Sequence, residues 1–484
     1  MNWRIKPLED ILASAERKAL RRSLGPFQLM MLGIGAVIGT GIFVLTAVGA
    51  ERAGPGLMLS FLIAGVVCAF AALAYAELAS MLPVAGSAYT YSYGVMGELI
   101  AWIVGWNLIL EYAVAASAVA VGWSGYMNGL LTSWGVHVPA AFTAGYFDLK
   151  NGQLGAGAGV INLLAVGVVV VVCALLVRGT RESAAVNTAL VFVKLVALGI
   201  FVAIALPNID WDNFSPFMPF GFLSHEVYDP TLDAHVAKGV MAAAALIFFA
   251  YVGFDAVSTA AEETRNPNRN VPIGLVGSLV LCTLIYLFVA AGAVGTMPTD
   301  ELKNSKEPLA EVLRNLGFQR IGDLIGVAAV LALPTVIMMM IFGQVRVFFA
   351  MSRDSLLPQR LSEVHPRFGT PWIMTILTGL LVMAVAGFFS VDEIAELSNT
   401  GTLLAFIAVS AGVLVLRMTQ PDRPRPFRCP AVWVIAPLAV AGCLFLLLSV
   451  PPKSLVRFSI WNVIGLAVYF LYSRSRSPLA ERPA

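Results

Sequence analysis

An apolar stretch near the start of the chain is interrupted by three closely spaced glycines, Gly35, Gly39 and Gly41, and Thr40 stands between the last two. Each glycine weakens a helix by about 1 kcal/mol relative to alanine, so the cluster predicts a helix that breaks. Broken backbone at membrane depth is tolerated only where it is buried in protein or lines a polar cavity. The break is therefore a candidate binding site.

A broken helix presents partial charges of both signs. Free N–H groups at the start of one half favour an anion, and free carbonyls at the end of the other half favour a cation. An α-amino acid would place its carboxylate on the amides of Thr40 and Gly41, and its ammonium on carbonyls near Val37 and Phe249–Ala250. Because Gly39 and Gly41 lack side chains, the ligand can approach the backbone. Such a site needs no charged side chain, and residues 27–50 contain none.

A second apolar stretch, residues 247–255, carries a matching defect. Gly253 and Asp255 stand near its middle, where neither favours a continuous apolar helix. The first break alone is also compatible with close helix packing through Gly35 and Gly39. Interruptions at corresponding positions of two halves indicate instead a transporter site at the interface of two repeats.

Two charged residues lie inside predicted spans, Glu111 and Lys194. Charges at membrane depth are costly and are candidate functional groups by default. Each could simply pair with a partner and fix helix packing. The functional interpretation of Lys194 is a proton carrier, because burial disfavours the charged form of a lysine; its ammonium could also occupy a position that sodium takes in related pumps. Glu77, nearer a span end, is predicted to be interfacial.

The composition places these residues in a polytopic membrane protein. The chain has 484 residues, of which 58% are hydrophobic and 12% charged, against about 25% charged in soluble proteins. A net charge of +2 gives no reason to expect nucleic acid. The five cysteines and four histidines show no metal or redox spacing, and no phosphate-binding loop, dinucleotide motif or nucleophile–base pair is present. We therefore expect no metal, no cofactor and no enzymatic activity.

Twelve stretches reach the roughly 20 apolar residues that a span needs. They are residues 27–50, 56–81, 98–130, 157–178, 184–206, 237–260, 273–296, 322–351, 372–389, 394–417, 430–450 and 455–473. With the N-terminus inside, most of the 31 Lys and Arg residues fall in inner segments, which predicts a multi-pass plasma (inner) membrane protein with both termini cytoplasmic. Because a repeat of five spans inverts in the membrane, spans 1–5 and 6–10 are predicted to be inverted repeats.

The predicted all-α chain thus divides into six parts. These are a cytoplasmic segment 1–26, a first repeat 27–206, an extracytoplasmic loop 207–236, a second repeat 237–417, spans 11 and 12 within 418–473, and a cytoplasmic tail 474–484.

Four stretches resemble signatures of the amino acid–polyamine–organocation superfamily. They are residues 35–43 in span 1, 83–91 after span 2, 248–267 in and after span 6, and 346–357 after span 8. The resemblance covers spans 1 to 10 and is closest to the bacterial branch related to cationic amino acid transporters. It implies the LeuT-type inverted-repeat fold with discontinuous helices 1 and 6, alternating access and proton coupling. The mammalian members of that branch have two further spans, so their regulation is not transferred.

The resemblance also implies roles for individual residues. Val37, Thr40 and Gly41, with Phe249, Ala250 and Val252, would hold the backbone of the amino acid; Glu111 matches an acidic position of span 3, Lys194 matches the lysine of span 5, and Met339 or Met340 matches a span 8 position that sets side-chain size. With Gly39 from the break, and Met340 taken from the span 8 pair, these form the predicted substrate site, with Lys194 and Glu111 coupling the proton. Methionine there could also be simple core or lipid-facing filling.

The function expected from these patterns is import of small neutral or aliphatic amino acids by proton symport across the lipid bilayer. The bulk of methionine in span 8 favours alanine or branched aliphatic substrates over large cationic ones. An exchanger of amines or cationic amino acids is the alternative within transport, and a non-transporting amino acid sensor is the alternative from another class. The particular substrate, the oligomeric state and any accessory subunit stay open at this stage, and a test of uptake separates the classes.

Overall fold

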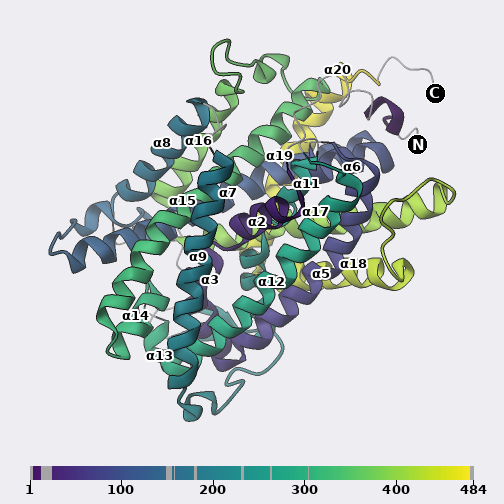
Figure 1. The fold of residues 1–484 in the computed structure, drawn as a ribbon. Helices are drawn as coiled ribbons and strands as arrows, with labels where there is room; N and C mark the ends of the chain where they lie inside the picture. Colours follow the sequence, from purple (N-terminus) through teal and green to yellow (C-terminus); the bar gives the residue numbers. More distant parts are fainter. Residues whose placement is uncertain are drawn as a thin grey trace.

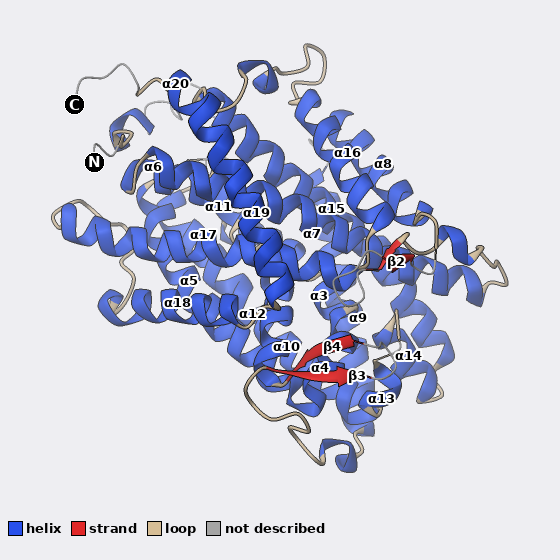
Figure 2. Ribbon diagram, turned by 180° about the vertical axis from the view of Figure 1, so that it is seen from behind, coloured by secondary structure: helices blue, strands red, loops and turns tan. Residues whose placement is uncertain are grey.

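The computed structural model describes residues 4–11, 24–84, 86–148, 155–156, 159–178, 183–229, 234–261, 264–303 and 305–479. Parts of the predicted N-terminal segment, of the loop 207–236 and of the tail 474–484 lie outside these ranges. So do Ala85, Glu262 and Glu263 of the signature stretches. The described chain is a bundle of helices (Figure 1) with two small antiparallel hairpins (Figure 2).

Apolar helices make up most of the bundle. They are α2 (Pro26–Val37), α3 (Thr40–Phe43), α4 (Leu45–Ala53), α5 (Leu57–Met81), α7 (Glu98–Ser133), α8 (Leu163–Arg178), α9 (Ser183–Ala205), α10 (Val240–Ile247), α11 (Ala256–Thr259), α12 (Pro267–Thr296), α15 (Gln319–Arg353), α16 (Trp372–Phe388), α17 (Val391–Thr419), α18 (Val432–Leu448) and α19 (Pro452–Val468). Proline is the first residue of α2, α12 and α19, where its missing N–H costs no helical hydrogen bond.

Short elements connect the apolar helices. The helices among them are α6 (Ser87–Val95), α13 (Thr299–Leu302), α14 (Pro308–Asn315) and α20 (Arg474–Arg476), with 3-10 turns η1 (Gly54–Gly56), η2 (Ala140–Phe142), η4 (Leu206–Asn208), η5 (Trp211–Phe214), η6 (Phe248–Tyr251) and η8 (Gln359–Ser362), and a π turn η9 (Tyr469–Ser473). Strand β1 (Phe147–Asp148) pairs with β2 (Gly155–Ala156), and β3 (His225–Asp229) pairs with β4 (Ala234–Lys238).

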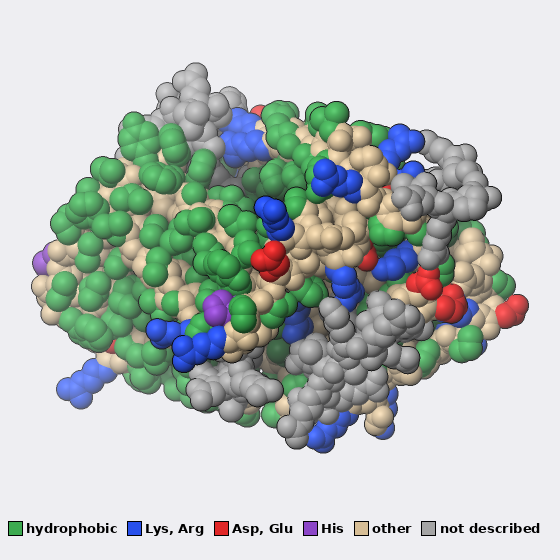
Figure 3. All heavy atoms as spheres, turned by 90° about the horizontal axis from the view of Figure 1, so that it is seen from above, with side chains coloured by type: hydrophobic (Ala, Val, Ile, Leu, Met, Phe, Trp, Pro, Cys, Tyr) green, Lys and Arg blue, Asp and Glu red, His purple; other side chains and the backbone are tan. Residues whose placement is uncertain are grey.

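The helices have the length and composition of membrane spans. Within the described residues, eight helical stretches are long and apolar enough to cross a membrane, and four further apolar helices are shorter. Each of the predicted apolar stretches overlaps at least one of the apolar helices given above. Hydrophobic side chains cover a broad part of the face in Figure 3, and Lys and Arg gather beside it. By length and composition, these helices are those of a polytopic membrane protein, in agreement with the prediction.

Both ends of the described chain lie at the same end of the bundle (Figure 1). The Arg4 guanidinium donates to the carbonyl of Arg474 (2.9 Å), and it also pairs with Glu98 at the start of α7 (3.5 Å). Tyr469 donates to the same Glu98 carboxylate (3.0 Å). The first and last described segments are therefore joined through one buried carboxylate.

A buried ion-pair cluster lies near the C-terminal end of α5. Glu77 accepts two hydrogen bonds from Arg417 (2.9 and 2.8 Å), one from Arg425 (3.1 Å) and one from the backbone N–H of Cys429 (2.7 Å). Burial raises the pKa of the neighbouring Cys429 thiol to about 11, and the Glu77 charge acts in the same direction. Glu77 thus lies at a helix end, but it is fully buried rather than solvated.

A second ion-pair cluster lies where α14 packs on α15. Arg314 pairs with Glu307 (2.7 Å) and with Asp323 (3.0 Å). Burial raises the pKa of the Glu307 carboxyl, and the hydrogen bond from Arg314 opposes that shift. The carboxylate also packs against α7, because a Cβ on Gly129 would lie 2.2 Å from Glu307 Oε1.

Candidate functional site

The first apolar stretch does break. Helix α2 ends at Val37, Ile38 is extended (φ −72°, ψ 94°), and Gly39 takes φ −143° and ψ −147° before α3 begins at Thr40. The interruption falls at Ile38–Gly39, within the predicted glycine cluster. Thr40 and Gly41 are the first residues of α3, where backbone N–H groups have no acceptor within a helix.

The second stretch breaks as well. Helix α10 ends at Ile247, a 3-10 turn covers Phe248–Tyr251, and Val252 is extended (φ −59°, ψ 133°). Gly253 follows with φ +110°, a backbone conformation that side chains with a Cβ disfavour. Helix α11 starts only at Ala256. The glycine is therefore the residue that allows the chain to turn here.

The two breaks are packed directly against each other. A Cβ added to Gly41 would lie 2.3 Å from the Cα of Ala250 and 2.4 Å from its Cβ. At Gly39 an added Cβ would lie 3.3 Å from the Val336 side chain. The missing side chain at Gly41 is thus needed for the contact between the breaks, a role that the sequence analysis did not consider.

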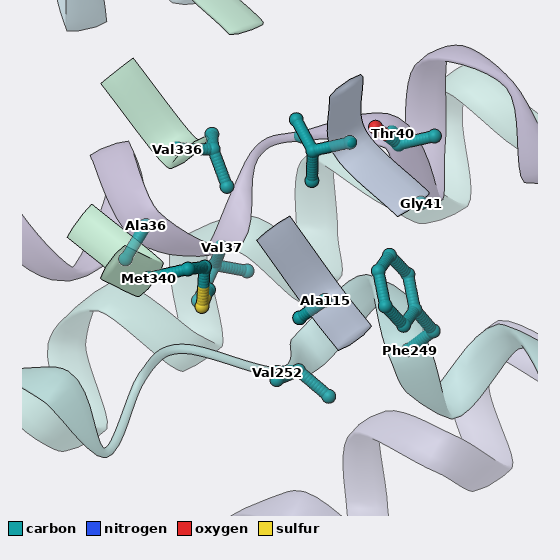
Figure 4. Close-up of a pocket in the computed structure, with 11 residues that line it drawn as sticks. Ala36, Val37, Thr40, Gly41, Ala115, Phe249, Val252, Val336 and Met340 are labelled. Atoms are coloured by element: carbon teal, nitrogen blue, oxygen red, sulfur yellow. The ribbon is translucent and has the colours of Figure 1, made fainter. Parts of the chain in front are cut away.

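A small cavity lies between the breaks (Figure 4). Seven of the eight predicted substrate residues line it, namely Val37, Gly39, Thr40, Gly41, Phe249, Val252 and Met340. The eighth, Ala250, lies behind Gly41 and does not line it. The volume is about 10 Å³, comparable with one water, so an amino acid can enter only if lining groups move apart.

Four lining residues escaped the sequence analysis, Ala36, Ala115, Val119 and Val336. Ala115 and Val119 come from α7, four residues apart on one face, and Val336 lies four residues before Met340 on α15. These are ordinary apolar side chains in apolar helices, and the sequence offers a signal only for Val336, through its spacing of four residues from Met340.

The structure also resolves the register of span 8. Met340 lines the cavity, whereas Met339 packs against Ala36 and Ala256 in a separate apolar cluster. Figure 4 shows the Met340 side chain beside Val37. Met340 is therefore the residue of the pair that faces the candidate site.

Lys194 binds the first break. Its ammonium donates to the carbonyls of Gly35 and Ile38, both at 2.9 Å, and the side chain is fully buried. These are carbonyls that the end of α2 leaves without helical partners. Lys194 thus acts on the break by direct contact, in the manner of a bound cation.

Two polar residues that hold the breaks were missed. The Tyr286 hydroxyl lies 2.8 Å from the Val37 carbonyl and 2.9 Å from the Ala250 carbonyl, so it bridges both breaks. Asn399 donates to the carbonyls of Ala245 and Leu246 near the end of α10 (2.7 and 3.0 Å). A polar side chain inside an apolar helix was the available signal, but its partners could not be known from sequence.

Glu111 lies next to the site without lining it. Both of its carboxylate oxygens are buried and accept no hydrogen bond in the described part of the chain. The Thr402 hydroxyl faces it but donates to the Ser398 carbonyl (3.3 Å). Asp255 is close enough to interact with it electrostatically and accepts a hydrogen bond from Tyr112 (2.8 Å).

One further group at the cavity has no partner. The Thr40 hydroxyl is buried, and no hydrogen-bond partner for it lies among the described residues. With the amides of Thr40 and Gly41 it forms a small set of donors beside the apolar lining. Among the described residues no group of three or more His, Cys, Asp or Glu could hold a metal.

Comparison with known proteins places the chain among transporters. The family described as "Amino acid permease" matches residues 24–472. The branched-chain amino acid permease BcaP of Bacillus subtilis is 46% identical over 480 residues, which cover 99% of both chains. The methylthioribose transporter of the same organism is 43% identical over 479 residues, again 99% of both chains. The cationic amino acid transporter 9 of Arabidopsis thaliana is 36% identical over 88% of this chain and 72% of the relative.

Replacing Gly41 with alanine tests the contact between the breaks. The new Cβ would lie 2.3 Å from the Ala250 backbone, so the two breaks must separate. We expect Gly41→Ala to lower the apparent melting temperature of the purified protein. The matched control is Gly199→Ala on the exposed face of helix α9, where nothing lies within 4 Å of the new Cβ and alanine favours the helix by about 1 kcal/mol. Equal melting temperatures for the two variants would contradict the close contact.

Proposed function

This chain belongs to the amino acid permease family, and on that premise we propose that it imports small neutral, aliphatic amino acids by proton symport. The observation that supports the proposal most is the pair of broken helices in contact around a cavity whose free polar groups are backbone amides and one hydroxyl. Two half-helices that meet in this way form the substrate site of many secondary transporters.

The substrate's carboxylate would bind the amides of Thr40 and Gly41 and the Thr40 hydroxyl. Its ammonium would approach the carbonyl of Val37, and that of Ala250 once the breaks move apart to admit the substrate, from the side opposite Tyr286, since each carbonyl oxygen has two lone pairs. Both ends of a zwitterion are then met by backbone groups. No charged side chain is required for this binding mode.

The side chain of the substrate would point to apolar walls. The side chains of Ala115, Val119, Val336 and Met340 offer no hydrogen-bonding group apart from the weakly accepting Met340 sulfur. A cationic side chain would lose its hydration there without gaining a partner. This argues for alanine, valine, leucine or isoleucine, and the relative named as a branched-chain amino acid permease agrees with that choice.

Lys194 is the proposed proton carrier. Its ammonium donates hydrogen bonds to the carbonyls of Gly35 and Ile38. Loss of the proton would weaken these hydrogen bonds to the first break. Protonation and the shape of the substrate site would then change together, which is what symport requires. Glu111, buried without a hydrogen-bond partner for its carboxylate, is the proposed second proton-carrying group.

The same proposal covers the membrane topology. We infer twelve crossings, two inverted repeats of five spans and both termini in the cytoplasm, because Lys and Arg are concentrated in the segments that this arrangement puts inside. The meeting of both chain ends at one end of the bundle agrees with an even number of crossings.

One relative suggests a second candidate substrate. The methylthioribose transporter is nearly as similar to this chain as the branched-chain permease. Methylthioribose has neither a carboxylate nor an ammonium, so it would leave the paired backbone donors and acceptors of the breaks unused. The amino acid is therefore the first choice, and methylthioribose belongs in the same assay.

Uptake into proteoliposomes tests the function. We expect labelled leucine or valine to accumulate under an inward proton gradient and to be displaced by unlabelled aliphatic amino acids, but not by lysine or methylthioribose. Counterflow without a proton gradient, with no accumulation when the gradient is imposed, would favour an exchanger. Failure of every neutral amino acid to enter would reject the proposal.

Lys194→Ala separates coupling from binding. Without the ammonium, the proton gradient should no longer drive accumulation, and uptake should fall to the level reached by simple equilibration. Substrate-induced thermal stabilisation should persist, because Lys194 does not line the cavity. The exposed Lys303, which pairs with Asp300, supplies the control Lys303→Ala, with normal accumulation. Normal accumulation by Lys194→Ala would remove its coupling role.

Met340→Ala tests the side-chain pocket. Shortening this wall should improve uptake of phenylalanine or methionine relative to alanine by about tenfold, since one or more methylene groups in a pocket change specificity by roughly 10–200-fold. Met339→Ala is the matched control, because Met339 packs outside the cavity, and its substrate ranking should match the parent's. A shift caused by Met339→Ala and not by Met340→Ala would reverse the assignment.

A further inference from the structure

A second, larger cavity of about 330 Å³ lies on the face of α7 away from the substrate cavity; we call it the α19 cavity. Its walls are apolar side chains from four helices and the turn between α16 and α17, among them Ala113, Val385, Leu397 and Trp461. Helices α16, α17 and α19 each pack on α7, which lies between α16 and α19 in Figure 2. Cavities of roughly 300–1,000 Å³ hold ligands of substantial size.

The α19 cavity and the substrate cavity share one helix. Ala115 and Val119 of α7 line the substrate cavity, whereas Leu110 and Ala113 of the same helix line the α19 cavity. At about 100° per residue these pairs face opposite directions. Whatever fills the α19 cavity therefore supports the helix that forms one wall of the substrate site.

One charged side chain faces these apolar walls. Of the described residues that line the α19 cavity, Arg457 alone is charged, and its guanidinium takes part in no hydrogen bond or ion pair with any described residue. Arg457 lies in the second turn of α19, on the same face as Trp461 one turn later. A guanidinium beside apolar surface near the membrane boundary is costly unless an anion or water meets it.

A second cation lies on the same face of α19, one turn before Arg457. Lys453 precedes Arg457 by four residues and is exposed near the start of α19, so the two cations share a face. An anionic headgroup would gain from both of them, whereas a zwitterionic headgroup would bring its own ammonium next to them. The combination of an apolar cavity and a cationic rim fits an amphipathic anion.

We propose that the α19 cavity is a binding site for an anionic phospholipid, with one acyl chain between α7, α16 and α17 and the headgroup phosphate on Arg457. Phosphate and guanidinium form strong charge-assisted hydrogen bonds, and the acyl chain covers the apolar walls. The lipid would brace α7 from the side opposite the substrate. The site is separate from the proposed transport site and does not depend on the identity of the substrate.

Lipid retention tests the proposal on the full chain. The protein is reconstituted into vesicles of equal parts phosphatidylglycerol and phosphatidylcholine and re-extracted in mild detergent. Retained lipids are then counted by native mass spectrometry. We expect preferential retention of phosphatidylglycerol, and Arg457→Gln should reduce it about fivefold, the factor expected for one cation facing anionic lipid. Arg320→Gln, an exposed arginine at the start of α15 outside the cavity, should retain as much as the parent.

Two further variants separate charge from cavity. Val385→Trp should fill the apolar part and lower phosphatidylglycerol retention although Arg457 is intact. Arg457→Lys keeps the positive charge, so it should fold and retain most of the lipid; a loss as large as that of Arg457→Gln would overturn the charge argument.

Three other outcomes would also overturn the proposal. Unchanged retention in Arg457→Gln would mean that the guanidinium reaches water instead of lipid. Equal retention of both lipids by the parent would remove the selectivity for an anion. A dimer mass in the parent that becomes a monomer in Arg457→Gln would identify a second copy of the chain as the occupant.

Discussion

A backbone carbonyl or N–H without a partner inside a membrane costs several kcal/mol, and the centre of this protein depends on meeting that cost. The two broken helices leave carbonyls that no helix can satisfy. Three side chains from other helices supply the donors: Lys194 from α9, Tyr286 from α12 and Asn399 from α17. Each donates to, or bridges, two carbonyls. The breaks are therefore stable because the rest of the bundle is arranged to hold them.

This arrangement joins substrate binding to conformation. The carbonyls of Val37 and Ala250, where the substrate ammonium is proposed to bind, already face one tyrosine hydroxyl that has a single hydrogen to share. A substrate that supplied its own N–H donors would relieve that shortage. With the substrate bound, the hydrogen bonds from Tyr286 would no longer be needed to hold the two breaks together. Similarly, a neutral Lys194 would donate less strongly to the end of α2. The substrate and the proton of the proposed symport would thus act on different carbonyls of the same break, Val37 for the substrate and Gly35 and Ile38 for the Lys194 ammonium.

The sequence was sufficient where a residue type conflicted with its surroundings. Glycines in an apolar helix indicated the first break, Gly253 and Asp255 indicated the second, and a lysine inside a span indicated a candidate functional cation, although not its contact with the break. It was insufficient where apolar residues sit in apolar helices, because Ala115, Val119 and Val336 look like any other wall of the bundle. Which of Met339 and Met340 faces the cavity could be decided only from the orientation of helix α15 in the structure. The role of Gly41 required knowing that Ala250 lies against it, a contact between segments far apart in the sequence.

Partner atoms, rather than burial, distinguish the charged side chains that the fold itself satisfies from those for which we propose a function. Glu77 and Glu111 are equally buried glutamates in apolar helices, and in the sequence only their distance from the ends of the predicted spans separates them. Glu77 accepts four hydrogen bonds from two arginines and a backbone N–H, so its burial is explained by the folded chain itself. The Glu111 carboxylate accepts none from the described residues, and the Arg457 guanidinium lies beside apolar walls and pairs with no described residue. The fold compensates the first charge completely. For the other two we have proposed compensation from outside the chain, a proton at Glu111 and a lipid phosphate at Arg457.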